Sequence, residues 1–130
     1  MASIFSKIIN KEIPSYTILE NRNFISFLDI NPLTLGHCLV VPKKEIDYIF
    51  DLEDELLADL MIFSKKVAKA IREAIPCNRI GTAVVGLEVP HAHQHLIPID
   101  SVDDINLNRP KLKPSQEELK ATAEKIRSYI

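Results

Sequence analysis

The chain has 130 residues, of which 46% are hydrophobic and 26% charged, a composition typical of one folded globular domain. Its net charge of −2 offers no basic surface to duplex nucleic acid, and no apolar run reaches the roughly 20 residues of a membrane-spanning helix. We therefore predict a single domain over residues 1–130, with neither a nucleic-acid nor a membrane partner. MASIFSKIIN lacks the features of a signal peptide, and Cys38 and Cys77 form no CxxC pair, so we expect a cytoplasmic protein.

The first half of the chain predicts a short lead followed by strands. Residues 3–10 form a short helical or extended lead. Residues 16–20 and 24–30 are strand candidates, and the Asn-Arg-Asn at residues 21–23 suits a hairpin between them. A third β-rich run, HCLVVPKK, is ended by Pro42, whose missing N–H cannot serve a central ladder.

The clearest helix is predicted over residues 52–74. Asp51 is its expected N-cap, and Pro76 prevents its continuation. Apolar residues recur along it at steps of three or four and form one stripe that should face the core, namely Leu56, Leu60, Phe63, Val67, Ile71 and Ala74.

The second half predicts two strands and a terminal helix. Residues 79–89 are apolar on both alternating sets, which is typical of a central strand, and residues 91–99 form a further strand. Ser115 and Glu118 form a capping box that begins a helix packed on the domain or on a partner. Strands in two runs around a long helix favour an α+β fold with a mostly antiparallel sheet, and a parallel crossover is the alternative.

Three of the four histidines occupy alternate positions in HAHQHLIPI: His91, His93 and His95. Successive side chains along a strand point to opposite faces, so the three imidazoles should emerge on one side of the strand. Such a row suits two kinds of chemistry.

The first is metal binding, because neutral imidazole is a common ligand of zinc, copper and iron. Along a strand, however, His91 and His95 lie about 13 Å apart at Cα, whereas zinc ligands lie only about 2.0 to 2.1 Å from the metal. Two of the three histidines could chelate one ion, and the remaining ligands would have to come from His37 or a carboxylate.

The second is nucleophilic attack on phosphorus. One ring nitrogen of the middle histidine, His93, would attack, while the other keeps its proton through a fixed hydrogen bond. His91 and His95 would flank it, one fixing the ring or backbone geometry and the other donating to a phosphoryl oxygen or to the leaving group.

The sequence resembles the histidine triad (HIT) family of nucleotide-binding proteins. HAHQHLI matches the family signature, except that Gln94 stands where an apolar residue is usual. IFSKIINKEIPSYTILEN, FISFLDINPLTLGHCLVVPKK and the following helix read in the family's order, so the resemblance covers roughly residues 3–99. It implies an HIT-like α+β fold with a five-stranded, mostly antiparallel sheet, a long central helix and a C-terminal helix.

The resemblance also implies a reaction. The expected activity is cleavage at the α-phosphate of a purine nucleoside phosphoramidate or dinucleoside polyphosphate, through attack by His93 and a nucleotidyl-histidine intermediate. His91, His95 and, from an adjacent strand, His37 complete the catalytic set. No metal and no other cofactor is implied, and members usually form homodimers with joined sheets. A metal-dependent enzyme and a nucleotide-binding regulator without catalysis remain alternatives.

A nucleotide-binding set follows from the same resemblance. Asp29 in FLDINP matches a carboxylate that accepts hydrogen bonds from ribose hydroxyls, and turn formation before Asn31-Pro32 is its other explanation. The apolar positions that match those enclosing the purine, each also a candidate for the core, are Phe5, Ile8, Ile13, Phe27 and Ile30.

Two departures from the family pattern bear on the substrate. In GLEV, which includes the site residues Gly86 and Glu88, Leu87 and Glu88 replace groups that would donate to phosphate. A carboxylate there repels a polyphosphate, so we expect a preference for a less charged phosphate ester or amidate. Ser3 and Ser6 stand where some relatives carry a zinc-binding cysteine pair, which removes the main reason to expect structural zinc.

Overall fold

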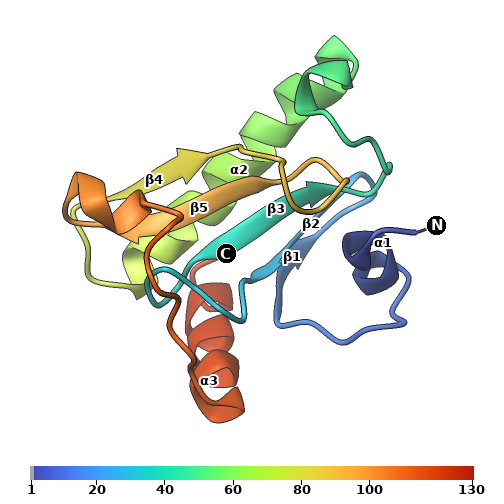
Figure 1. Ribbon diagram of the computed structural model, residues 1–130. Helices are drawn as coiled ribbons and strands as arrows, with labels where there is room; N and C mark the ends of the chain where they lie inside the picture. The colour runs from blue at the N-terminus through green and yellow to red at the C-terminus, as the bar shows by residue number, and fades with distance from the viewer. Residues whose placement is uncertain (1) are drawn as a thin grey trace.

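The computed structural model describes residues 2–130 and consists of one sheet flanked by helices (Figure 1). The sheet has five strands in the order β1-β2-β3-β5-β4, and each neighbouring pair is antiparallel. This confirms the α+β prediction and rules out the parallel crossover. The strands are β1 Thr17–Glu20, β2 Phe24–Leu28, β3 Cys38–Pro42, β4 Arg79–Ala83 and β5 Gln94–Ile99, and the helices are α1 Ile4–Ile9, α2 Asp54–Ala74 and α3 Gln116–Arg127, with 3-10 helices η1 Ile49–Asp51 and η2 Val102–Ile105.

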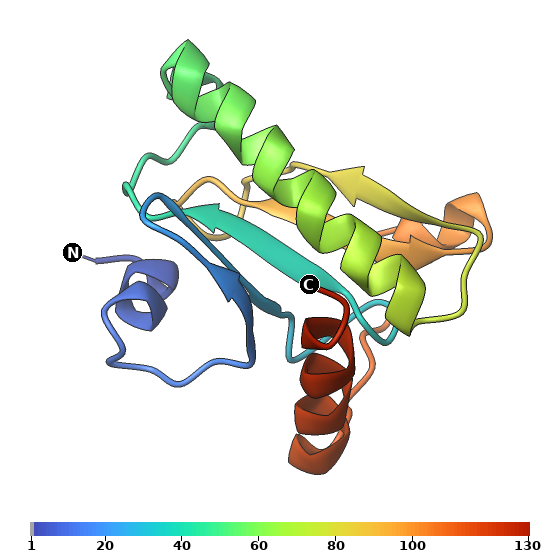
Figure 2. The ribbon, with the colours of Figure 1, turned by 180° about the vertical axis from the view of Figure 1, so that it is seen from behind.

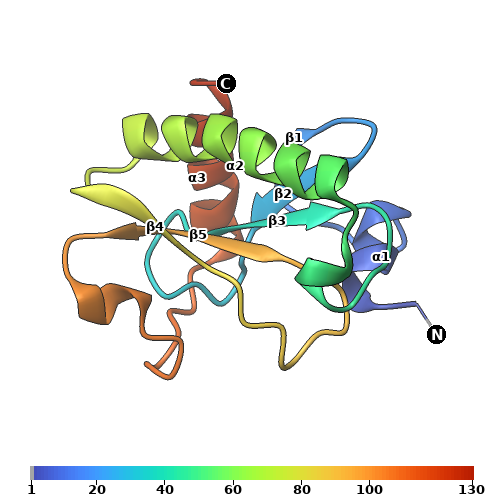
Figure 3. The same cartoon turned by 90° about the horizontal axis from the view of Figure 1, so that it is seen from above.

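Helices α2 and α3 cover one face of the sheet, which Figure 2 shows from their side and Figure 3 from above. The predicted stripe of α2 is buried except for Leu56, which is half-buried. It packs against side chains such as Phe24, Val40 and Leu96, which alternate toward this face from three strands. The main hydrophobic core therefore lies between α2 and the sheet.

The start of α2 differs from the prediction. Asp51 belongs to η1, and the N-cap of α2 is Glu53, whose side chain makes no capping hydrogen bond. The preceding 3-10 turn directs Ile49 and Leu52 into the core. Burial of these two side chains fixes the chain path here, and it outweighs the capping preference of an aspartate.

A smaller core lies on the opposite face, where the predicted lead forms α1. Ser3 caps this helix, because its Oγ accepts the N–H of Ser6 at 3.0 Å. The buried members of this second cluster are Phe5, Ile8, Ile25, Phe27, Leu39 and Val41. The sheet is thus covered on both faces, with α1 on the side away from α2.

Strand β4 is shorter and less central than predicted. It ends at Ala83 and lies at the sheet edge, where its side chains are half-buried or exposed. Its last pairing partner is His95, the second residue of β5, so only one residue of that strand lies beyond this pair. Residues 84–89 therefore leave the sheet and form a loop beside the histidines.

The C-terminal helix follows the prediction. Ser115 and Glu118 form the capping box of α3, with Glu118 N–H donating to Ser115 Oγ at 3.1 Å. Leu119, Ala123 and Ile126 are buried against the rest of the domain. None of the helices within residues 2–130 combines the length and hydropathy that a membrane span requires.

Candidate active site

The histidine stretch enters the sheet only at its third histidine. Strand β5 begins at Gln94, so the prediction of a strand from residue 91 is wrong, and both His91 and His93 precede it. Pro90 has no N–H, and the N–H of Ala92 donates to the carbonyl of Ile46 at 2.7 Å, outside the ladder. These two features keep the stretch from pairing before Gln94.

The alternation of faces nevertheless persists through this stretch. Ala92 and Leu96 lie in the core beneath α2. Gln94, between them, is held by two neighbours: Ser64 Oγ donates to its Oε1 at 2.8 Å, and its Nε2 donates to Thr82 Oγ1 at 2.7 Å. The polar residue that departs from the family pattern is therefore satisfied within the core. The side chains at positions 93 and 95 take the opposite face.

His93 is held in one tautomer. Its Nδ1 lies 2.8 Å from the carbonyl oxygen of His91, and because a carbonyl oxygen only accepts, Nδ1 carries the proton. The neutral ring therefore has an unprotonated Nε2, the form that a nucleophile requires. The ring of Phe5 meets the His93 ring edge-on, with 4.9 Å between centroids, and fixes its plane.

A tight loop before β3 places His37. Its N–H donates to the carbonyl of Thr34 at 3.1 Å, and Gly36 adopts a φ of +96°. Glycine suits this position because a Cβ would meet Ile75 Cγ1 at 2.9 Å and because L side chains rarely adopt this φ. The N–H of Leu33 then donates to Nδ1 of His37 at 3.1 Å. The proton of the neutral His37 ring is therefore on Nε2.

His37 in turn sets the tautomer of His95. Its Nε2–H donates to Nδ1 of His95 at 2.9 Å, which leaves the His95 proton on Nε2. Burial, the largest cause, and the neighbouring histidine and Lys111 together lower the pKa of His37 to about 3 and that of His95 to about 4. Both rings are therefore neutral near pH 7. Neutral His95 carries an N–H donor beside His93.

The ring of His91 also lies on the α1 side of the sheet, with its centroid 5.9 Å from that of Phe5, and it fixes the local geometry through its hydrogen bonds. It is fully buried: its Nε2–H donates to the carbonyl of Pro42 at 2.7 Å, and its Nδ1 accepts from Ser3 Oγ at 2.7 Å. Glu45 Oε1 accepts from Ser3 N–H at 2.6 Å and from Ser6 Oγ at 2.8 Å. Both serines thus belong to a hydrogen-bonded cluster around His91, which contributes its backbone carbonyl to the next histidine.

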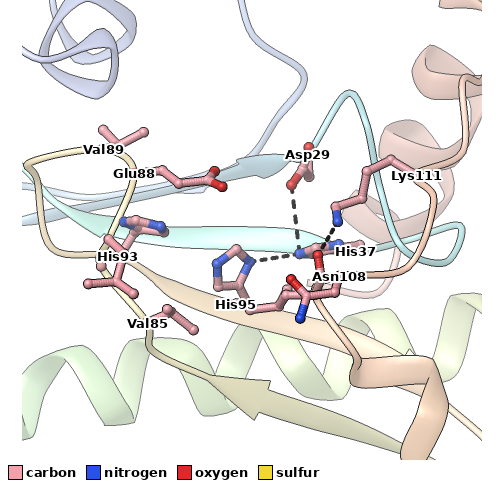
Figure 4. A pocket seen from close by; sticks show the side chains of 12 residues that line it. Asp29, His37, Val85, Glu88, Val89, His93, His95, Asn108 and Lys111 are labelled. Carbon is pink, nitrogen blue, oxygen red and sulfur yellow. Dashed lines mark hydrogen bonds and ion pairs between the residues drawn. The ribbon is translucent and has the colours of Figure 1, made fainter.

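A cavity of about 260 Å³ lies over His93 and His95 (Figure 4). Six of the predicted site residues line it: Asp29, His37, Gly86, Glu88, His93 and His95. The remaining lining residues are Val85, Leu87, Val89, Leu107, Asn108 and Lys111. The cavity therefore combines three histidines with two carboxylates and one ammonium group.

Asp29 both forms a turn and lines this cavity. Its Oδ1 accepts the N–H of Asn31 at 2.9 Å, and its Oδ2 lies 3.8 Å from Nε2 of His37. Burial raises the pKa of the Asp29 carboxyl group, although 24% of the side chain remains accessible. The two explanations offered by the sequence are thus compatible, because one oxygen completes the turn while the other remains an acceptor.

Lys111 is a cavity residue that sequence reasoning missed. It lies in the segment between η2 and α3, and the N–H of Leu112 donates to the carbonyl of Pro32 at 2.8 Å, which joins this segment to the loop after β2. The Nζ of Lys111 donates to the carbonyls of Leu107 and, at 3.1 Å, Arg109. A lysine in a polar segment carries no sequence signal for such a position, because only the return of the chain brings it there.

The residues predicted to enclose a purine do not line this cavity. Val89 connects the two regions, since it lines the cavity and packs against the smaller core. Phe5, Ile8 and Phe27 are buried in that core, and Ile13 packs against it. Ile30 is 56% exposed. The predicted set is therefore mainly a core that supports the site.

Asp29, His37 and His95 also place potential metal-ligating atoms within 4.8 Å of one another. A metal needs an unprotonated nitrogen, yet the Leu33 amide occupies Nδ1 of His37 and leaves the proton on Nε2. Coordination through Nε2 would require the loss of that proton or of the amide hydrogen bond. This donor set fits a hydrogen-bonded histidine pair better than a metal centre.

Comparison with known proteins agrees with this geometry. The family model of the HIT domain matches residues 10–102. The adenosine 5′-monophosphoramidase hnt1 of Schizosaccharomyces pombe is 36% identical over 132 residues, covering 100% of this chain and 99% of that protein. The adenosine 5′-monophosphoramidase HNT1 of Saccharomyces cerevisiae is 40% identical over 98 residues, covering 75% and 62%. A Hit-like protein from Bartonella henselae has a similar crystal structure, with a TM-score of 0.84, 32% identity, and coverage of 98% and 96%.

Proposed function

Because this chain belongs to the HIT domain family, we propose that it is a hydrolase that cleaves purine nucleoside 5′-phosphoramidates at the α-phosphorus through a nucleotidyl-His93 intermediate. The observation that carries the proposal is the fixed tautomer of His93, which gives it an unprotonated Nε2 next to the N–H donor of His95. The activity named for the two yeast relatives supports the choice of a phosphoramidate.

In the first step, the lone pair of His93 Nε2 forms a bond to phosphorus while the phosphorus–nitrogen bond breaks. The departing amine keeps the electron pair of that bond and takes one proton from solvent. His93 retains its Nδ1 proton, so its ring becomes positively charged, and the carbonyl of His91 accepts the hydrogen bond from that proton. The N–H of His95 donates to a phosphoryl oxygen.

In the second step, a water oxygen attacks the phosphorus. The bond between phosphorus and His93 Nε2 breaks, and its electron pair returns to the nitrogen. The attacking water releases one proton to solvent, which balances the proton taken up by the amine. The net reaction consumes one water and yields the nucleoside monophosphate and the free amine.

The nucleoside end of the substrate is assigned to the Asp29 side of the cavity. The accessible oxygen of Asp29 accepts hydrogen bonds from ribose hydroxyls, because a carboxylate is a pure acceptor. The exposed side chain of Ile30, which follows directly, supplies an apolar contact for the base. The smaller core behind them supports these contacts: Phe5, Ile8, Ile13 and Phe27.

The charges of the cavity favour a phosphoramidate over a dinucleoside polyphosphate. Glu88 and Asp29 are acidic, and Lys111 is the one Lys or Arg among the lining residues. The Nζ of Lys111 uses two of its three N–H groups on backbone carbonyls, which leaves one for a phosphoryl oxygen. One phosphate can accept the remaining N–H of Lys111, whereas each further phosphate of a polyphosphate adds repulsion from Glu88.

The test is the His93→Ala variant with adenosine 5′-phosphoramidate. We expect kcat/KM to fall by at least about 10³-fold, while the Kd for AMP changes by less than about threefold, because the nucleophile contributes to chemistry before binding. Mass spectrometry of the wild-type protein after brief exposure to substrate should find a nucleotidyl group on His93. Full activity of the variant would refute the mechanism, and tight binding by the wild type without turnover or adduct would instead favour a regulator.

A homodimer is the proposed assembly. Strand β4 lies at the sheet edge with no strand partner on its outer side within residues 2–130. Met61 and Ile62 of α2 are 58% and 67% exposed, and a second copy joined to the sheet would cover apolar surface of this kind. Sedimentation at micromolar concentration measures the mass directly, and a monomer would contradict this assignment.

A further inference from the structure

A second cavity lies on the other side of the 84–87 loop from the features used above. It has a volume of about 320 Å³ and is formed by the segment 47–50, which leads into α2, and by the loop after β4. Its large apolar lining residues are Tyr48, Ile49, Phe50, Val84, Val85 and Leu87. Asp47 is the only Asp, Glu, Lys or Arg among the residues that line it.

Five of the six large apolar side chains of this second cavity are exposed, and Ile49 is buried. Phe50 is 70% and Leu87 is 89% exposed, and Tyr48 packs edge-on against Phe50 with 5.5 Å between ring centroids. Several large apolar groups gathered at one accessible place mark a binding surface more often than a neutral part of the exterior. The cluster is therefore a candidate binding surface.

His93 belongs to both cavities, and so does the turn that separates them. This turn is centred on Gly86, whose φ of +73° lets Val85 and Leu87 contribute to both walls. A phosphorus atom bonded to His93 can therefore extend one substituent into each cavity. The polar cavity contains Asp29 and is assigned to the nucleoside, so the other substituent of the phosphorus is directed to the apolar one.

We infer that the second cavity binds the leaving group of the substrate, and that this group is a primary amine with an aromatic or branched apolar body. The inference rests on the proposed function and specifies its substrate class. Leu87, which replaces a hydrogen-bond donor of the family pattern, then has a use as an apolar contact for that body. A polyphosphate leaving group is excluded by the lack of a lining cation and by the carboxylate of Asp47.

The experiment compares two adenosine 5′-phosphoramidates, made from methylamine and from 2-phenylethylamine. Both are primary alkylamines, so the bond that breaks is nearly the same and the apolar body is the main difference. We expect kcat/KM of the wild-type enzyme to be about 10- to 30-fold higher for the phenylethyl compound, the effect of burying most of one ring. Phe50→Ala should reduce this ratio to about two- or threefold, and Phe50→Leu should keep most of it.

Val102→Ala is the matched control, because Val102 is 87% exposed and lines neither cavity. It should leave the ratio at the wild-type value. A ratio of two substrates in one preparation does not change when part of the enzyme is unfolded, so a merely structural effect of Phe50→Ala would not move it.

Different outcomes separate this inference from the proposed function. If the wild type cleaves both compounds at similar kcat/KM, or if Phe50→Ala keeps the wild-type ratio, the leaving-group assignment is wrong and the proposed hydrolase remains. If Phe50→Ala changes the sedimentation mass but not the ratio, the cavity is a subunit contact and the assignment is again wrong. If the wild type cleaves neither compound, the proposed function fails and the assignment fails with it.

Discussion

The buried pair of His37 and His95 should make the fold sensitive to acid. An unfolded histidine has a pKa of 6.5, whereas burial lowers the pKa of folded His37 to about 3. Between these two values the unfolded chain binds a proton that the folded chain does not. Stability from this group is therefore complete above pH 6.5 and is lost as the pH falls toward 3.

The size of the loss follows from the same two pKa values. At pH 4.5, two units below the unfolded pKa, the loss for His37 alone is about 3 kcal/mol, since each unit corresponds to about 1.4 kcal/mol. A domain of this kind is stable by only about 5 to 15 kcal/mol in total. His95, with its pKa lowered to about 4, changes stability in the same direction. The pair thus removes a large part of the stability before pH 4.

Urea denaturation of the wild type and of His37→Gln at pH 7.5 and pH 4.5 measures this effect. The variant should lose about 2 to 3 kcal/mol less than the wild type between the two pH values, because one group that titrates on unfolding has been removed. Burial raises the pKa of the Asp29 carboxyl group, so its contribution to stability increases as the pH falls. Asp29 is present in both proteins, so this contribution largely cancels in the comparison. Equal pH dependence in the two proteins would show that His37 is not a buried neutral ring.

Two further pairs of variants test the site and the core. Lys111→Met should lower the affinity for AMP relative to adenosine by about tenfold in calorimetric titrations, because one cation facing the phosphate is lost. Lys113→Met, which lies outside the cavity lining, should leave this ratio of affinities unchanged. Equal effects of the two variants would contradict a phosphate contact. Ser26→Ala should raise the free energy of unfolding by about 1 kcal/mol, since its buried hydroxyl has no hydrogen-bond partner within residues 2–130. Ser64→Ala should lower the free energy of unfolding by about 1 to 2 kcal/mol, because Gln94 Oε1 loses its donor. A change of the same sign in the two serine variants would refute this account of buried hydroxyls.

Several elements of this fold were predictable because their causes are local in the sequence. The hairpin at residues 21–23, the apolar stripe of α2 and the capping box of α3 each depend on residues a few positions apart. The opposite faces of Gln94 and His95 likewise follow from the period of an extended chain. Such patterns survive in the tertiary structure because burial reinforces them.

The failures of prediction occurred where distant segments decide. Residues 79–89 have the composition of a central strand, but β4 ends at Ala83 because its partner strand begins nearby at Gln94. His91 does not line the cavity, because its ring is buried on hydrogen bonds to Ser3 and Pro42, and both lie far from it in the sequence. No periodicity within the histidine stretch contains that information.

The sequence by itself determined that three histidines alternate, that a long amphipathic helix covers a sheet, and that the chain resembles the HIT family. Only the tertiary structure decided which ring nitrogens carry protons, since the amide of Leu33 sets the tautomer of His37 and His37 sets that of His95. It also decided that Lys111 joins the cavity and that a second, apolar cavity adjoins His93. Hydrogen bonds and charges act over a few ångströms of space, whatever the number of residues that separates their partners along the chain.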